Sequence, residues 1–270
     1  MITSYTNTGI GDAPKWGISG FALKVIAIVS MFIDHTAVII LPEIIESATN
    51  TYSKADIKVV GLQFLFLFMR IVGRLAFPIF AFLLVEGFFH TGSRLRYAAR
   101  LLVFAIISEL PFDLAFHDSL FDMSYNNVFF TLFLGLIAIM ILDYAIREMI
   151  VGDEDAKYDW GPLGIILGLL LVVVSMAGLP IVAQMLVCCD YKAGGVLTIL
   201  AFYCFRHRKF AASLFSTSIL TMLCGMLEVF TVFDSFLIGL YDGTRGRKMK
   251  YFFYFFYPMH LLILVAISNI

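Results

Sequence analysis

The feature that most constrains this chain is a series of continuous apolar runs, most of them close to the length that crosses a lipid bilayer. A membrane-spanning helix needs about 20 apolar residues, and such runs follow one another along the sequence with only short polar segments between them. The chain is 61% hydrophobic and 14% charged, whereas soluble domains carry about 25% charged residues. These observations predict an all-α, polytopic integral membrane protein in which several helices are broken.

Nine apolar runs can be assigned as transmembrane helices, with a range of eight to ten because the runs at 210–226 and 228–241 are short. The Gly-Leu-Pro sequence at 178–180 predicts a tight turn between two helices. Residues 1–20 are polar, and we expect them to form a cytoplasmic segment before a single transmembrane domain at 21–270. The runs cover residues 21–42, 64–90, 98–116, 128–147, 161–178, 180–205, 210–226, 228–241 and 251–268.

The positions of lysine and arginine predict the orientation of the chain in the cell (inner) membrane. Cytoplasmic loops carry an excess of these residues, and the loops at 91–100, 206–209 and 242–250 are basic. Placing all three inside agrees with nine crossings, a cytoplasmic N-terminus and an external C-terminus. Two segments fit less well, because the acidic loop 148–160 would then lie inside and the segment 43–63, which contains lysines, would lie outside.

Ionisable residues within the apolar runs are the main functional signal, because such groups are costly in hydrocarbon and usually mark a functional site. Pro78, Pro111 and Pro258 also interrupt three of the runs. Irregular backbone at membrane depth is tolerated where it is buried or lines a water-filled cavity. The pattern therefore predicts a polar cavity between the midplane and the outer face. The ionisable members of this layer, each from a different predicted helix, are His35, Arg74, Glu109, Asp190 and His260.

Asp34 and His35 give this layer a chemical interpretation. Adjacent residues on an α-helix point about 100° apart, so these two side chains are not expected to bond to each other. Asp34 can instead pair with Arg70 or Arg74 of the next helix. His35 would then face the cavity, where a neutral imidazole can accept a proton from an amine or a hydroxyl group.

The remaining polar residues leave alternatives. Glu109 or Asp190 could orient the imidazole or the acceptor. A buried charge network that only fixes helix packing is the other interpretation, and it applies to Arg70, Arg74, Glu109 and Asp113. The cysteines lack metal-ligand spacing, a net charge of −1 does not indicate nucleic-acid binding, and the loops are too short for a soluble catalytic domain. Any chemistry should therefore take place among the membrane helices, without a metal.

Basic residues gather at the predicted cytoplasmic ends of the helices. The orientation rule explains most of them, but they would also suit an anionic cytoplasmic ligand that carries phosphates. Lys24 stands out because it lies eleven positions before His35 on one predicted helix, a distance of about 16 Å. The candidates for contact with such a ligand are Lys24, Arg94, Arg100, Arg245 and Lys248.

The spacing of Lys24 and His35 resembles a motif of membrane-bound acyltransferases that use acyl-coenzyme A, in which a basic residue and a histidine are separated by ten residues. A more extensive resemblance, over residues 21–265, is to the TraX family. It is carried, in order, by the segments LKVIAIVSMFIDHTAVI, RIVGRLAFPIFAFLLVEGFFHTGSRLRYAARLLVFAIISELPFDLAF, NVFFTLFLGL, DYKAGGVLTILAFYCFR and FYFFYPMHLLIL.

The resemblance to the TraX family implies a transmembrane acetyltransferase. The founding activity of that family is N-terminal acetylation of pilin, and similar proteins acetylate sugars across membranes. Acetyl-CoA would then be the cytoplasmic donor, and a pilin-like peptide amine or a surface glycan the outer acceptor. Carried over by position, His35 is the catalytic residue, Asp34 its neighbour and Lys24 the residue on the CoA side. Lys192 departs from the family, which often has glycine there.

The sequence leaves further alternatives for the reaction and for the function. Asn127, Tyr257 or an arginine could donate to the oxyanion, and transfer could be direct or could pass through an acetyl-histidine. Broken helices and an Asp, His and Glu layer are also typical of a proton-coupled secondary transporter, although no inverted repeat is evident. A structural partner in a secretion system would tolerate apolar residues in place of Asp34 and His35.

Overall fold

A computed structural model describes residues 17–54, 56–122, 124–151, 161–185 and 187–269. Within these ranges the regular structure is helical, with two isolated β-bridges. The elements are α1 (Gly20–Ile39), α2 (Leu41–Thr51), α3 (Ile57–Gly73), α4 (Ala76–His90), α5 (Arg94–Phe116), α6 (Val128–Tyr144), η1 (Ala145–Val151), α7 (Gly161–Val173), η2 (Val174–Gly178), α8 (Leu179–Met185), α9 (Lys192–Cys204), α10 (Lys209–Cys224), η3 (Met226–Phe233), α11 (Asp234–Gly239) and α12 (Lys250–Ser268).

The helices confirm the all-α membrane class. In the described part of the chain, five helical stretches are long and apolar enough to cross a bilayer. They are Gly20–Thr51, Ile57–His90, Val128–Val151, Pro162–Met185 and Tyr251–Ser268. Two shorter apolar helices, α9 and α10, lie between the fourth and the fifth. Helix α5 is 23 residues long but carries several charged residues.

The predicted turn at 178–180 is wrong, because the helix continues through this segment from α7 to α8. Its π-helical part, η2, has wider hydrogen bonding, in which the Leu179 N–H reaches the carbonyl of Val174. A π-bulge of this kind accommodates a proline, which has no N–H to donate, and so Pro180 lies within the helix. The chain instead breaks further on, where Asp190 N–H bonds to the Asn126 carbonyl at 2.8 Å before α9 begins.

The segment at 228–241 also differs from the predicted spanning helix. It is divided into the 3₁₀-helix η3 and the six-residue α11, which return along α10 after a turn at Gly225. The turn requires glycine because its φ is 128°. Thr231 Oγ1 donates to Thr217 Oγ1 at 2.9 Å and joins the two arms of this hairpin. The tip of the hairpin lies beside α3, as the bond from Arg74 to Glu228 shows.

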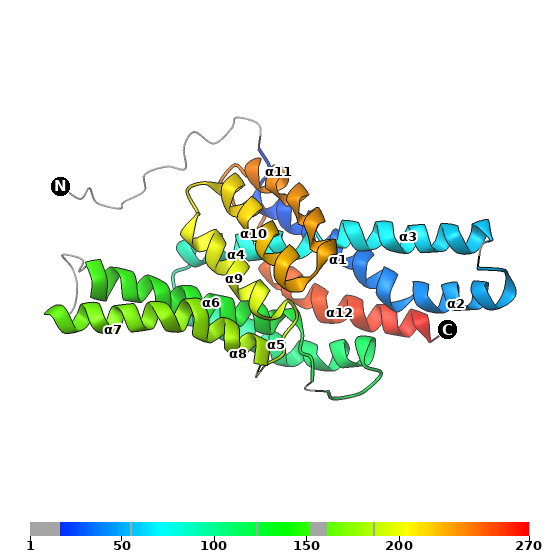
Figure 1. The fold of residues 1–270 in the computed structure, drawn as a ribbon, viewed down its shortest axis with the longest axis horizontal. Coiled ribbons are helices and arrows are strands. Elements are labelled where there is room, and N and C mark those ends of the chain that lie inside the picture. The colour runs from blue at the N-terminus through cyan, green and yellow to red at the C-terminus, as the bar shows by residue number, and fades with distance from the viewer. Residues whose placement is uncertain (1–16, 55, 123, 152–160, 186, 270) are drawn as a thin grey trace.

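The connections fall at two opposite ends of the molecule. Figure 1 shows the α2–α3 connection and the end of α12 at one end of the long axis, and the α4–α5 connection and the start of α7 toward the other. The basic connections meet at this second end, where Lys209 Nζ donates to the Tyr241 carbonyl at 3.1 Å. Gly20 N–H likewise bonds to the Thr244 carbonyl at 2.8 Å. The basic connections thus lie at one end of the molecule, as the orientation prediction requires.

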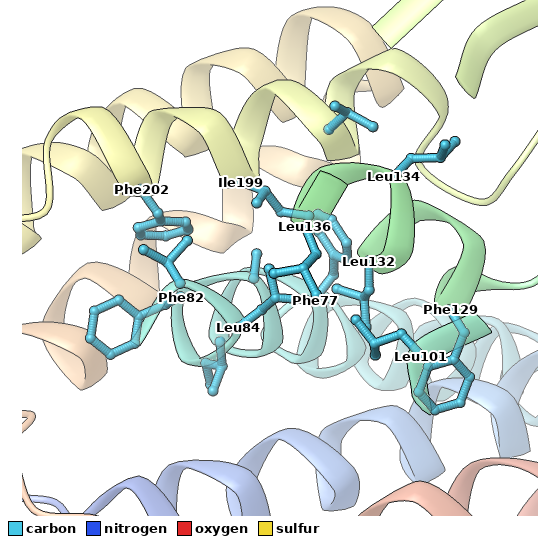
Figure 2. Close-up of a cluster of buried hydrophobic side chains, with 14 of the residues drawn as sticks. Phe77, Phe82, Leu84, Leu101, Phe129, Leu132, Leu134, Leu136, Ile199 and Phe202 are labelled. Carbon is cyan, nitrogen blue, oxygen red and sulfur yellow. The ribbon is translucent and has the colours of Figure 1, made fainter. Parts of the chain in front are cut away.

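Helix α4 lies at the centre of the apolar core. A helix that is apolar on all sides is expected to be buried, and most residues of α4 are buried. Figure 2 shows Phe82 and Leu84 of α4 beside Leu136 of α6 and Ile199 and Phe202 of α9. The Phe82 and Phe202 rings meet edge to face with their centroids 5.8 Å apart. This core packs α4, α6 and α9 together, and the polar site lies beside it.

Candidate active site

A cavity of about 480 Å³ lies where α1, α3, α4, α5 and α12 meet the hairpin tip and the start of α9. Its lining combines charged residues with aromatic rings, as ligand sites commonly do. The polar lining comes from seven separate segments of the chain, which only the folded structure brings together. The charged and polar lining residues are Asp34, His35, Arg70, Arg74, His117, Tyr125, Asp190, Tyr191, Lys192, Cys224, Glu228 and Tyr257.

His35 on α1 lines this cavity and bonds to His260 on α12. His35 Nδ1 and His260 Nε2 are 2.7 Å apart, and the two rings lie nearly parallel, at 11°, with centroids 4.9 Å apart. Rings stacked face to face could not bring two nitrogens so close, so they meet edge to edge in nearly one plane. The rings of Phe116 and Tyr257 contact His35 at centroid distances of 5.4 and 6.1 Å. His35 is therefore held on three sides.

Asp34 points away from His35 and pairs with both arginines named from the sequence. Its carboxylate lies 2.8 Å from Arg70 Nη1 and 2.9 Å from Arg74 Nη2. Gly73 permits this approach, because a Cβ there would lie 2.3 Å from the Cβ of Asp34. Arg74 also donates to Glu228 at 2.6 Å. Two carboxylates and two guanidinium groups thus balance their charges, as buried ions in a membrane protein require.

Asp190 lines the cavity without bonding to His35. Its Oδ1 accepts from the Tyr125 hydroxyl at 2.8 Å and from the Tyr191 N–H at 3.0 Å. The turn that carries it is tightly wound, with positive φ at Tyr191 and at Lys192 (46°). Left-handed backbone of this kind favours glycine, so glycine would be unstrained at Lys192, where the resemblance described above implies one. The Tyr191 ring stacks on Phe77 at 4.0 Å and holds the turn in place.

Three polar residues named from the sequence lie beside the cavity rather than in its lining. Asn127 donates through Nδ2 to Glu109 and to the Ala105 carbonyl, and its Oδ1 accepts from the Phe129 N–H to cap α6. Asp113 accepts from the backbone N–H of Asp122 at 2.8 Å. The structure therefore does not bring Glu109 to His35, and the hydrogen bonds of the Asn127 amide serve the start of α6. These contacts match the packing interpretation of Glu109 and Asp113.

The five basic candidates for the donor side also lie outside the cavity lining. Lys24 Nζ lies 5.6 Å from the ring centroid of Phe253 on α12. Arg94 pairs with Asp143 at 2.8 Å, and the Arg100 guanidinium lies 5.6 Å from the ring centroid of Tyr97. Arg245 and Lys248 are exposed. The basic end and the histidine site are thus separate places, joined by the length of α1 and by the aromatic face of α12.

Sequence reasoning missed Glu228, Tyr125 and Tyr191 as members of the site. Glu228 carries a signal, because an acidic residue within a predicted apolar run is expected to have a partner. That signal could have identified Arg74 as the partner of Glu228 once the tip of the hairpin was known. Tyr125 and Tyr191 lie in polar connections and carry no comparable signal in the sequence.

Comparisons with known proteins identify the family of this chain. The family described as "TraX protein" matches residues 19–268. The chain is 30% identical over 274 residues to the "Probable fimbrial assembly protein FimC, serogroup H1" of Dichelobacter nodosus, and the match covers 92% of this chain and 95% of that protein. No solved structure matches the chain. A match over nearly the whole length shows that the chain belongs to the TraX family.

Proposed function

We propose that this chain transfers an acetyl group from cytoplasmic acetyl-CoA to an amine or hydroxyl acceptor that enters from the outer side of the membrane. The observation that carries the proposal is His35, which lines a cavity in the helical bundle and bonds to His260 only through Nδ1. Its Nε2 has no hydrogen-bond partner within the described ranges. An imidazole held this way has one ring nitrogen free to move a proton.

The proposed site for acetyl-CoA is argued from distance and charge. Eleven positions separate Lys24 from His35 on α1, which is about 16 Å, a length that a pantetheine arm can cover. Lys24 could hold the phosphates of CoA while the thioester reaches the cavity. Phe253, Tyr254 and Tyr257 on α12 would line the route. Phe253 contacts the ring of Phe21 on α1, Tyr254 that of Phe104 on α5, and Tyr257 that of Phe129 on α6. We expect these rings to separate when the donor enters.

The transfer itself follows ordinary acyl chemistry. The amine or hydroxyl of the acceptor attacks the thioester carbonyl, and its proton passes to His35 Nε2. A new C–N or C–O bond forms, the C–S bond breaks, and the proton moves from His35 to the sulfur, which leaves as the free thiol of CoA. Charge develops on the carbonyl oxygen and needs donors. Arg70 has N–H groups beyond the one it gives to Asp34, and it lines the cavity with Tyr257.

The name of the relative suggests which acceptor to test first. The Dichelobacter nodosus protein is named as a fimbrial assembly protein, so a fimbrial subunit is the first acceptor to test for this chain. The cavity has aromatic and acidic lining, from Tyr125, Tyr191 and Asp190. Such a lining can hold an amine before it loses its proton, and it can also bind a sugar hydroxyl. Incubation with a peptide amine or a glycan in turn would separate the two.

Replacing Lys24 with alanine should weaken acetyl-CoA binding about tenfold, a loss of about 1.4 kcal/mol, because one charge-assisted contact to phosphate is removed. Bound ligand raises thermal stability by mass action, so the concentration of acetyl-CoA that stabilises the purified protein measures this loss. Lys58→Ala is the matched control. Lys58 is exposed at the start of α3, and this start lies at the opposite end of the molecule from the α4–α5 connection (Figure 1). Equal stabilisation of the Lys24 variant and the wild type would remove Lys24 from the donor site.

A membrane-impermeant maleimide added from the outer side should modify Cys224 and stop transfer. Cys224 is exposed and lines the cavity, with its Sγ 3.5 Å from the Tyr191 carbonyl. The adduct would fill part of the space that the acceptor needs. Cys224→Ser should keep its activity after the same treatment. Cys204, which is exposed at the C-terminal end of α9, should react only from the cytoplasmic side. Modification of Cys224 only from the cytoplasmic side would reverse the proposed orientation.

A further inference from the structure

His260 lies between His35 and a backbone carbonyl, and each of its ring nitrogens has one partner. His260 is 3% exposed. Its Nδ1 is 2.8 Å from the Phe256 carbonyl oxygen, one turn earlier on α12. Its Nε2 is 2.7 Å from His35 Nδ1. These two contacts together determine where the protons of both rings must lie.

The direction of each bond follows from the chemistry of the groups. A carbonyl oxygen can only accept, so the proton of this contact belongs to His260 Nδ1. A neutral imidazole carries one N–H and one lone pair, so His260 Nε2 presents its lone pair. His35 Nδ1 must then donate to it. A neutral His35 therefore carries its proton on Nδ1 and a lone pair on Nε2.

We infer that His260 is a positioning residue, which fixes His35 as the Nδ1–H tautomer and thereby keeps the Nε2 lone pair free for the reaction. The inference rests on the proposed function for its catalytic meaning, but the tautomer itself does not depend on that function. Both routes of acyl transfer need this lone pair, since His35 either takes the proton of the acceptor or attacks the thioester itself. His260 thus has the place that a carboxylate has in many catalytic triads.

The opposite arrangement is disfavoured by charge. For His35 Nδ1 to accept, His260 would have to carry protons on both nitrogens and become a cation. The ring contacts the Phe256 carbonyl, His35 and the aromatic rings of Phe32, Phe256 and Tyr257. Within the described ranges no carboxylate bonds to it. A buried charge without a partner is costly. During transfer, when His35 itself becomes cationic, its Nδ1–H bond to His260 becomes charge-assisted and stronger.

The test compares two substitutions of His260. In His260→Gln the amide oxygen can accept from His35 Nδ1, as Nε2 of the imidazole does. In His260→Leu the side chain keeps its bulk but loses the acceptor. We expect kcat to fall about 10- to 100-fold in the leucine variant, comparable to the loss when the hydrogen-bond partner of a metal-ligating histidine is removed, with KM for acetyl-CoA unchanged. The glutamine variant should recover most of the rate. Equal loss in both variants would overturn the inference.

A spectroscopic measurement separates the inference from the proposed function. Nitrogen-15 NMR of the full chain with labelled histidine distinguishes the two neutral tautomers, and the chain contains only five histidines, so the signal missing from a His35→Gln sample identifies His35. We expect the Nδ1–H form in the wild type and in His260→Gln, and a mixture of both forms in His260→Leu. An Nε2–H signal for His35 in the wild type would overturn the inference, whether or not the protein transfers acetyl groups. Absence of transfer together with the Nδ1–H form would instead reject only the proposed function.

Discussion

Alanine at His35 is expected to lower acetyl transfer by about 10²- to 10⁴-fold, the contribution typical of a positioned general base, while the protein remains folded in the membrane. The imidazole lines the cavity, and its substitution leaves the Asp34 pairs with Arg70 and Arg74 in place. The loss should therefore appear in kcat rather than in the affinity for acetyl-CoA. Transfer from labelled acetyl-CoA measures the first quantity, and thermal stabilisation by acetyl-CoA measures the second.

A histidine outside the site provides the matched control for this experiment. His90 is exposed at the end of α4, where its Nδ1 contacts the Glu86 carbonyl one turn earlier at 2.8 Å. His90→Ala removes the same group and should leave transfer unchanged. Full activity in His35→Ala would exclude His35 from the reaction. A fall in binding with an unchanged rate constant would make it a donor-binding residue.

Asparagine at Asp34 is expected to destabilise the protein by about 3–5 kcal/mol, the cost typical of breaking a buried ion pair. The carboxylate accepts from both Arg70 and Arg74 and is mostly shielded, with its side chain 11% exposed. Its neutral amide would leave Arg70 without a counter-charge and leave Arg74 with Glu228 alone. The free energy of unfolding of the purified protein in detergent or lipid measures this loss.

The control for Asp34 is an acid that makes no such pairs. Glu46 is exposed on α2, and Glu46→Gln makes the same change from carboxylate to amide. It should alter stability by less than about 0.5 kcal/mol, as surface substitutions usually do. A similarly small effect for Asp34→Asn would show that the network adds little to stability. If the variant stays folded but loses transfer, Asp34 takes part in the reaction as well as in the packing.

Hydropathy was enough to predict the class of the fold, because the bilayer sets the length and composition of its helices. It could not locate the break at 187–191, because a π-helical stretch carries Pro180 within a continuous helix. Hydropathy also could not predict that η3 and α11 form a hairpin with α10, because residues after the turn at Gly225 are as apolar as those of a membrane-spanning helix. These features decide which residues reach the cavity, and Glu228 enters it only because the hairpin turns there.

For the site, the sequence could predict pairs that follow from helix geometry alone. The different directions of Asp34 and His35 follow from the 100° step between adjacent helical residues. The pairing of Asp34 with Arg70 and Arg74 could be predicted because these arginines lie on the next helix. The partner of His35 could not be predicted. Depth along a helix can be counted from its end, but the face that each of Glu109, Asp190 and His260 presents depends on how the helices are rotated in the bundle. Of these three residues, the structure brings His260 into hydrogen-bond contact with His35.

The most direct test of the central claim uses sealed inverted membrane vesicles, which expose the cytoplasmic face to the medium. Acetyl-CoA labelled in the acetyl group is added outside, and label on peptides and glycans inside the vesicles is counted for the wild type, His35→Ala and His90→Ala. The proposed function predicts that label accumulates inside with the wild type and with His90→Ala, but not with His35→Ala. Equal label in all three, or label that never crosses the membrane, would contradict it.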